Sequence, residues 1–150
     1  MLRVVALVLF LVPAILAQTQ VQPCPQGNLP IAFELVSCSH GDCPPIVENT
    51  IMTLRIGVRT NYVTTRLPAY VVLITAEGEV NFPLETGDAC VNIPGYCDPY
   101  LPTGDHYFEA KIMAGGVPVN EEFITRVEIF DDNQRSVACG QMPLVVYPRA

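Results

Sequence analysis

The sequence predicts a single all-β domain, built as a sandwich or a barrel of short strands. Apolar residues recur at every second position in several stretches, whereas no stretch of useful length shows the 3.6-residue period of an amphipathic helix. Fourteen prolines and ten glycines are spread over the 150 residues, and they divide the chain into short pieces. Short strands at this spacing are typical of sandwiches and barrels.

The clearest expected strand covers residues 50–60, TIMTLRIGVRT. Met52, Leu54, Ile56 and Val58 alternate there with threonine, arginine and glycine. Successive side chains of a strand point to opposite faces of the sheet, so this alternation predicts one buried face and one solvated face.

Further strands are expected on both sides of this one. Residues 69–76 are almost continuously apolar, which predicts a more buried strand. Residues 106–114 and 123–130 alternate, and residues 31–38 and 141–147 supply the first and last strands. The side chains expected to face inward from the two alternating strands are Phe108, Ala110, Ile112, Phe123, Thr125, Val127 and Ile129.

The strand pattern leaves the state of the interior open. A filled core and a pair of sheets held apart by an apolar ligand both need apolar inner faces. An immunoglobulin-like adhesion domain with a filled core is therefore one alternative to a ligand carrier.

The first 17 residues, MLRVVALVLFLVPAILA, have the layout of a secretory signal peptide. Arg3 precedes an apolar run that is too short to span a membrane, and Ala17 is a small residue at the expected cleavage position. Residues 1–17 are thus predicted to be a signal peptide and residues 18–150 a single secreted, extracellular domain.

Six cysteines lie in the expected mature chain, and an even number in an exported protein predicts three disulfides. Six cysteines allow 15 pairings. Small local loops favour Cys38–Cys43 and Cys90–Cys97, which leaves Cys24–Cys139 to join the two ends of the chain. In the entropic model, a loop that long contributes about 4–5 kcal/mol by restricting the unfolded state.

The charge balance argues against nucleic acid and anionic membranes as partners. The chain has 8 Lys and Arg against 15 Asp and Glu, and removal of the signal peptide would take away one of the cations, Arg3. An acidic surface repels polyanions, and its ordinary role is to keep an exported protein soluble.

Catalytic and metal-binding interpretations are weak. His106 follows Asp105, but adjacency in sequence is not the geometry of a catalytic triad. His40 lies inside the expected Cys38–Cys43 loop, and the cysteine spacing contains no CxxC pair, which disfavours zinc. Asp131 and Asp132 are better explained by a turn than by a calcium site, because calcium needs several more oxygen ligands. We expect no enzyme activity, no metal and no cofactor.

The cysteine order resembles that of the ML-domain family, the lipid-recognition proteins. One cysteine comes near the mature N-terminus, then a pair with four residues between, a pair with six between, and a last cysteine before the final strand. The segments VNFPLETGDAC (80–90), CDPYLPTGDHYFEAKI (97–112) and VEIFDDNQRSVACGQMPLVV (127–146) also resemble family segments. The likeness covers roughly residues 22–147 and is greatest for the soluble Niemann-Pick type C sterol carrier, or epididymal secretory protein, branch.

The resemblance implies an immunoglobulin-like β-sandwich of two antiparallel sheets, with the same three disulfides and an apolar cavity for lipid between the sheets. The phenylalanine of the family's Phe-Pro segment falls on Phe82, and other contacts fall at the end of the strand that follows the second cysteine pair. The implied function is reversible transport of a sterol or similar apolar lipid by a monomer, with hand-off to a membrane or a receptor. The lipid-binding residues expected on this basis are Phe82, Val58, Leu73, Phe108, Ile112, Ala114, Val117, Phe123 and Val127.

The sequence also departs from the family pattern. The segment 114–123 differs from the family's Tyr-Pro loop, and the family's tryptophan in the penultimate strand is replaced near Val127. No Asn-x-Ser/Thr sequon is present, which makes glycan-dependent lysosomal delivery less expected than secretion. The alternative is an innate-immune module for microbial lipid, whose phosphates would need cations at the pocket mouth. The candidate cations are Arg55, Arg59, Arg66 and Lys111, and the candidate polar groups for a carrier's ligand are Tyr62, Tyr100 and Tyr107.

Overall fold

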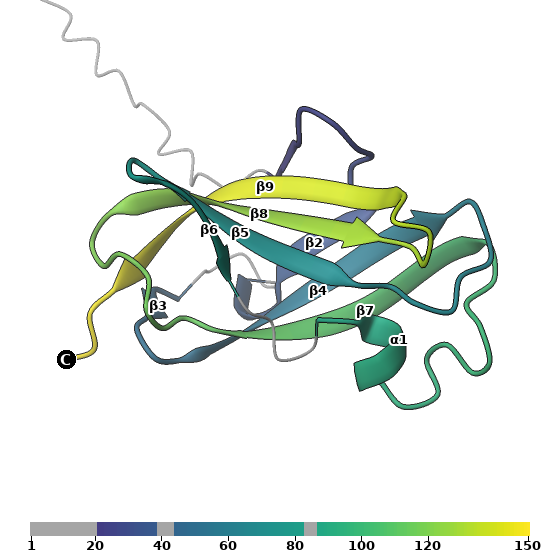
Figure 1. The fold of residues 1–150 in the computed structure, drawn as a ribbon. Helices are drawn as coiled ribbons and strands as arrows, with labels where there is room; N and C mark the ends of the chain where they lie inside the picture. Colours follow the sequence, from purple (N-terminus) through teal and green to yellow (C-terminus); the bar gives the residue numbers. More distant parts are fainter. Residues whose placement is uncertain (1–20, 39–43, 83–86) are drawn as a thin grey trace, which may run out of the picture.

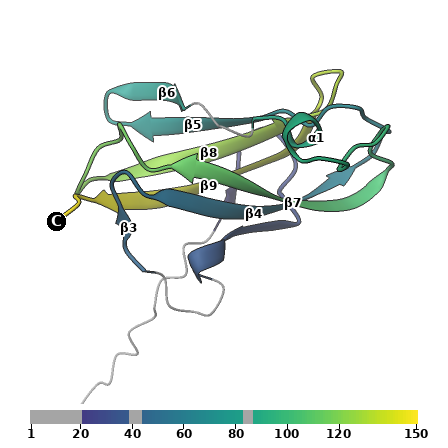
Figure 2. The ribbon, with the colours of Figure 1, turned by 90° about the horizontal axis from the view of Figure 1, so that it is seen from below.

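The computed structural model describes residues 21–38, 44–82 and 87–150. Within these residues two β-sheets lie face to face and enclose one core (Figures 1 and 2). This confirms the expected immunoglobulin-like β-sandwich. No helix in these ranges is both long enough and apolar enough to cross a membrane.

The larger sheet has six strands. Five of them are paired in the order β1-β9-β8-β5-β6, and β3 pairs with the C-terminal end of β9. Its pairings are antiparallel apart from that of β3 with β9. The smaller sheet is antiparallel and has the order β2-β4-β7. The strands of the larger sheet are β1 (Gln22–Pro23), β3 (Ile46–Val47), β5 (Ala69–Thr75), β6 (Gly78–Phe82), β8 (Glu122–Phe130) and β9 (Ser136–Tyr147), and those of the smaller sheet are β2 (Ala32–Leu35), β4 (Ile51–Thr60) and β7 (Gly104–Met113).

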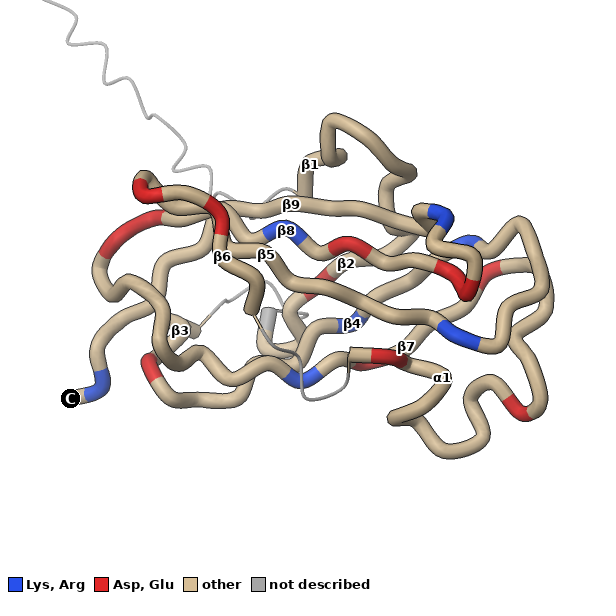
Figure 3. The backbone as a smooth tube through the Cα atoms, viewed as in Figure 1, with Lys and Arg blue, Asp and Glu red and all other residues tan. Residues whose placement is uncertain are grey.

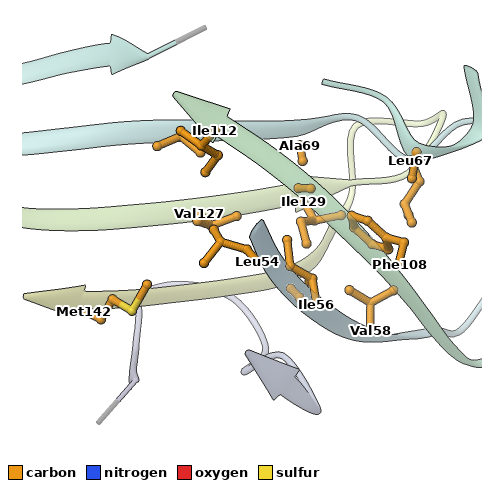
Figure 4. Close-up of a cluster of buried hydrophobic side chains, with 14 of the residues drawn as sticks. Leu54, Ile56, Val58, Leu67, Ala69, Phe108, Ile112, Val127, Ile129 and Met142 are labelled. Carbon is orange, nitrogen blue, oxygen red and sulfur yellow. The ribbon is translucent and has the colours of Figure 1, made fainter. Parts of the chain in front are cut away.

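The alternation of apolar residues sets the inner faces as predicted. On β4, Leu54, Ile56 and Val58 are buried, whereas Arg55 and Arg59 are exposed. Figure 4 shows side chains from β4 and β7 meeting those from β8 between the sheets. The core residues there include Leu54, Ile56, Val58, Phe108, Ile112, Val127 and Ile129.

Two predicted strands have different limits. The first strand ends at Leu35, because residues Val36–Cys38 form a 3-10 turn (η1). The last strand begins earlier, at Ser136, so Cys139 lies within it and not before it. Pro143 lies within β9, and proline cannot donate a backbone hydrogen bond. On the edge of β9 away from β8, β1 pairs at Gly140 and Gln141 and β3 pairs from Val146 onward. Pro143 lies between these two pairings, where this edge has no partner strand.

Two of the three expected disulfides lie in the described residues, and both are present. Cys24–Cys139 ties the N-terminal segment to β9, with a Cα–Cα distance of 5.6 Å and a sequence separation of 115. Cys90–Cys97 closes the loop that follows α1 (Ala89–Asn92). The expected Cys38–Cys43 bond involves Cys43, which lies outside the described residues.

The Cys90–Cys97 loop packs onto the core. Asp88 caps α1 by accepting the N–H of Cys90, and it also accepts the N–H of Leu67. The Tyr96 ring meets Phe108 edge to face at 6.0 Å between centroids. The loop therefore closes the end of the sandwich that lies away from the C-terminus (Figures 1 and 2).

Candidate functional site

An apolar cavity lies between the two sheets, in the half of the sandwich that contains the end of β9. Its volume is about 20 Å³, which is room for about one water-sized sphere, and part of it is open to solvent. Both sheets contribute side chains to it, and so does the segment that follows β7. Its lining consists of Leu35, Met52, Leu54, Val71, Leu73, Phe82, Ile112, Met113, Ala114, Val117, Phe123, Thr125, Met142, Leu144 and Val146.

The lining runs from buried to partly exposed. Leu54 and Val71 are each 2 % exposed, whereas Met113 is 44 % exposed. Phe82, Val117 and Leu144 are half-buried. The cavity is thus closed by core residues on one side and opens to solvent past apolar side chains on the other.

The cavity is narrow in this conformation, because a water-sized sphere fits into only a small part of it. Three methionines, Met52, Met113 and Met142, line it. Methionine is unbranched and flexible, so these side chains can move to admit a larger group. A sterol-sized molecule would need such movement, together with some separation of the sheets.

Within the described ranges, no ionisable side chain lines the cavity. The lining can therefore bury apolar surface, at about 25 cal/mol per Å² removed from water. It contains no general acid, general base or nucleophilic pair of the kind that covalent chemistry requires.

Six of the nine residues expected to contact lipid are in the lining. The resemblance pointed to Phe82, and the structure places it at the end of β6, paired with Val71 of β5. The other five that line the cavity are Leu73, Ile112, Ala114, Val117 and Phe123.

The other three expected contacts, Val58, Phe108 and Val127, do not line the cavity and are core residues. Val58 lies four residues beyond Leu54 on β4, which is about 13 Å along a strand. Phe108 is covered by Tyr96 of the disulfide loop. The structure therefore does not bring these three to the cavity, and their contact with lipid stays a prediction; residues of the disulfide loop are likewise not in the lining.

The sequence interpretation missed several lining residues. Alternation had already placed Met52, Leu54 and Thr125 on inner faces, so these could have been found. Met113 is the last residue of β7, and the alternation assigns it to the solvent-facing side of that strand. The alternation therefore did not predict that Met113 lines the cavity. The remaining missed residues are Leu35, Val71, Met142, Leu144 and Val146.

The candidate tyrosines do not reach the cavity. Tyr62 lies beneath the guanidinium of Arg135, 3.7 Å from Cζ to the ring centroid. Tyr107 is on the outer side of β7, over Gly57 of β4. Tyr100 is half exposed and also absent from the lining.

The candidate cations are exposed, and three of the four are paired with carboxylates. Figure 3 marks where basic and acidic residues lie along the backbone. Arg55 Nη1 is 2.8 Å from Glu34 Oε1, and Arg59 Nη2 is 2.8 Å from Asp105 Oδ2. Arg66 Nε is 2.9 Å from Asp88 Oδ2. Lys111, like these three, is not in the cavity lining.

The Asp-Asp segment forms the expected turn. Asp131 is buried and accepts the backbone N–H groups of Asn133 and Arg135 as well as Nε of Arg135. Burial alone would raise the pKa of Asp131, but these hydrogen bonds outweigh it and hold the pKa below its ordinary value. Within the described ranges, no group of three or more His, Cys, Asp or Glu side chains is arranged to hold a metal.

The histidines do not form a triad in the described residues. The hydrogen bond from Arg59 lowers the pKa of Asp105, so this carboxylate is engaged on the outer face. His106 Nε2 lies 2.7 Å from the carbonyl oxygen of Pro102. His40 lies outside the described residues.

No family model matches the sequence, and no curated protein matches it. Solved structures do match the fold. A Niemann-Pick type C2 protein from the Japanese carpenter ant superposes with a TM-score of 0.65 at 12% identity, over 85% of this chain and 98% of that chain. Chicken MD-1, solved in complex with lipid IVa, gives a TM-score of 0.51 at 16% identity, over 84% and 96%.

A third structure, the C-terminal domain of wzt, gives a TM-score of 0.54 at 12% identity, over 89% of this chain and 81% of that chain. These identities are low, so the likeness concerns the fold. The chain has the β-sandwich fold of the ML-domain proteins Niemann-Pick type C2 and MD-1, which agrees with the family likeness of its cysteine order.

Proposed function

We propose that this chain is a secreted ML-domain protein that binds and carries a sterol or similar apolar lipid as a monomer. The observation that carries the proposal is the uncharged cavity between the sheets, which opens past half-buried apolar side chains. The cysteine order, the Phe-Pro segment and the fold shared with a Niemann-Pick type C2 protein support the same class.

Binding would be driven by removal of apolar surface from water. A lipid burying about ten methylene groups gains roughly 8 kcal/mol before the cost of association. A gain of that size corresponds to about micromolar affinity, and deeper burial lowers the dissociation constant further. No bond is made or broken, so we propose a carrier and not an enzyme, with release by hand-off to a membrane or a receptor.

The proposal is tested by binding of dehydroergosterol, a fluorescent sterol, and its displacement by cholesterol. Phe82→Ala removes a lining side chain, and we expect it to weaken binding about tenfold or more. Phe130→Ala is the matched control, because Phe130 is also half-buried but lies on the outer face against Tyr70, with 5.8 Å between ring centroids. Binding that is absent in the wild type, or equally weakened by the two substitutions, would contradict the proposal.

A second candidate function is recognition of microbial lipid, which the likeness to MD-1 in complex with lipid IVa favours. A phosphorylated headgroup needs free cations near the cavity. Arg55 and Arg59 already form ion pairs on the outer face of β4. These ion pairs would have to break before either arginine could bind a phosphate. Binding of lipopolysaccharide that is lost in the Arg55→Ala, Arg59→Ala double variant would favour this second function over sterol transport.

A further inference from the structure

Thr125 is the one residue with a hydrogen-bonding side chain in the cavity lining that the structure describes. It is 3 % exposed, and its Oγ1 has no hydrogen-bond partner. Two other side-chain atoms in the described ranges share this condition. Tyr96 Oη lies in the disulfide loop, and Arg126 Nε is paired electrostatically because it lies 2.7 Å from Glu128 Oε1.

Buried threonine hydroxyls elsewhere in the molecule do have partners. Thr64 Oγ1 donates to the Arg66 carbonyl at 2.7 Å and accepts the N–H of Asp132 at 3.1 Å. Thr60 Oγ1 donates to the Pro102 carbonyl at 2.8 Å. A buried hydroxyl without a partner costs free energy, so Thr125 is an exception that needs a physical reason.

The strand register places Thr125 well inside the cavity. Its cross-strand partners are Leu73 on β5 and Met142 on β9, and both also line the cavity. These neighbours present only hydrocarbon and a thioether, which is a weak acceptor. The missing partner of the hydroxyl is therefore not supplied by the side chains beside it.

An ordered water is a poor partner at this position. A buried water typically makes about three hydrogen bonds and needs two to four polar groups around it. Apart from Thr125, the lining residues have apolar side chains. A water there would have Thr125 as its one side-chain partner, whereas a ligand oxygen attached to an apolar body needs only one.

We propose that the Thr125 hydroxyl binds an uncharged oxygen of the ligand, so that the preferred lipids carry a hydroxyl, ketone, ester or ether oxygen on the part that lies against β8, between the two sheets. This inference rests on the proposed function. The oxygen is uncharged because, among the lining residues that the structure describes, there is no cation to compensate a buried carboxylate or phosphate. A fatty acid with its carboxylate at this depth is excluded for the same reason.

The test compares three sterols that differ in oxygen content: cholest-5-ene, which has none, cholesterol, and 25-hydroxycholesterol, which has a second hydroxyl at the other end. Affinities are measured by displacement of dehydroergosterol, with the tracer calibrated separately for each variant. We expect the wild type to bind at least one oxygenated sterol about tenfold more tightly than cholest-5-ene. Thr125→Val should abolish this preference while leaving the affinity for cholest-5-ene unchanged or higher, and Thr125→Ser, which keeps the hydroxyl, should retain it.

Other outcomes separate this inference from the proposed function. Equal wild-type affinity for the three sterols, or a preference that Thr125→Val leaves intact, would overturn the role of Thr125 while leaving sterol binding in place. A wild type that binds none of the three overturns the proposed function and this inference with it. Thermal unfolding shows whether each variant folds, and if Thr125→Val does not, Thr125→Ala, which also removes the hydroxyl, takes its place: loss of the preference supports the role of Thr125 and its retention overturns it.

Discussion

Thr125 of β8 and Met142 of β9 are direct cross-strand partners, and both side chains line the same cavity. The register of the β8–β9 pair therefore brings an unpartnered hydroxyl and a flexible thioether together between the sheets. Leu73 lies opposite Thr125 on the other neighbouring strand. This part of the cavity wall is built by regular strands and not by loops, so its position depends on the sandwich as a whole.

The unpartnered hydroxyl predicts an unusual stability effect. Thr125→Val in lipid-free protein should leave the free energy of unfolding unchanged or raise it by up to about 2 kcal/mol, because it removes a buried polar group that has no hydrogen bond. Thr64→Val is the control, and it should cost about 1–3 kcal/mol, since it removes a buried hydroxyl that donates to the Arg66 carbonyl and accepts the N–H of Asp132. Denaturant unfolding measures both, and equal losses in the two variants would show that the Thr125 hydroxyl is paired in solution.

The place of Ala114 in the cavity lining predicts that a larger side chain is tolerated better there than in the core. Ala114 and Ala110 are each 2 % exposed, but only Ala114 lines the cavity. Ala114→Leu should cost less unfolding free energy than Ala110→Leu, which should lose about 1–3 kcal/mol by overpacking the core, because the methionines that line the cavity can move to admit the larger side chain. Ala114→Leu should also reduce sterol affinity by an order of magnitude, because the new side chain occupies the ligand's volume. A larger loss of unfolding free energy in Ala114→Leu than in Ala110→Leu would contradict this prediction.

Close packing over Gly57 predicts a steric penalty on the outer face of the smaller sheet. A Cβ at Gly57 would lie 2.7 Å from Cε1 of Tyr107 and 3.0 Å from Cβ of Ala32. Gly57→Ala should lower the unfolding free energy by about 1–3 kcal/mol, without a direct effect on the cavity. In a double-mutant cycle, Tyr107→Ala should recover part of that loss, and no recovery would mean that the Tyr107 ring is not the obstacle.

The Asp131 turn predicts a pH-dependent contribution to stability. The pKa of Asp131 is held below its ordinary value in the folded protein, so its contribution is present above the pKa of the unfolded chain, near 3.9, and is lost as the pH falls through the folded-state pKa. Asp131→Asn should cost about 1–3 kcal/mol at pH 7. The difference from wild type should shrink below about pH 4, and chemical unfolding at pH 7 and pH 3 measures it. A penalty that is the same at both values would show that the charge of Asp131 does not matter.

Much of the fold could be predicted from the sequence. Alternation at Leu54, Ile56 and Val58 defined the inner face of β4 because burial follows the two-residue period of a strand. The cysteine order gave the Cys24–Cys139 and Cys90–Cys97 bonds. The alternation is local, and the Cys90–Cys97 bond closes a short loop, so a single sequence records both directly; Cys24–Cys139, with a sequence separation of 115, was the pair that remained.

The extent of the cavity could not be predicted in the same way. Val58 and Leu54 share one face of one strand, yet only Leu54 lines the cavity. The difference arises because Val58 belongs to the packed core in the other half of the sandwich, where Tyr96 of the disulfide loop packs on Phe108. That contact depends on how a long connection folds back on the core, and alternation carries no information about it.

The central claim is that the cavity binds an apolar lipid, and native mass spectrometry of the protein produced in eukaryotic cells tests it most directly. We predict a wild-type population heavier than the polypeptide by the mass of one lipid, which organic extraction releases and identifies. Ala114→Leu, made in the same cells, should lack that population while keeping its fold. Wild-type protein that carries no lipid and takes up none from added cholesterol, or lipid bound equally to both proteins, would contradict the claim.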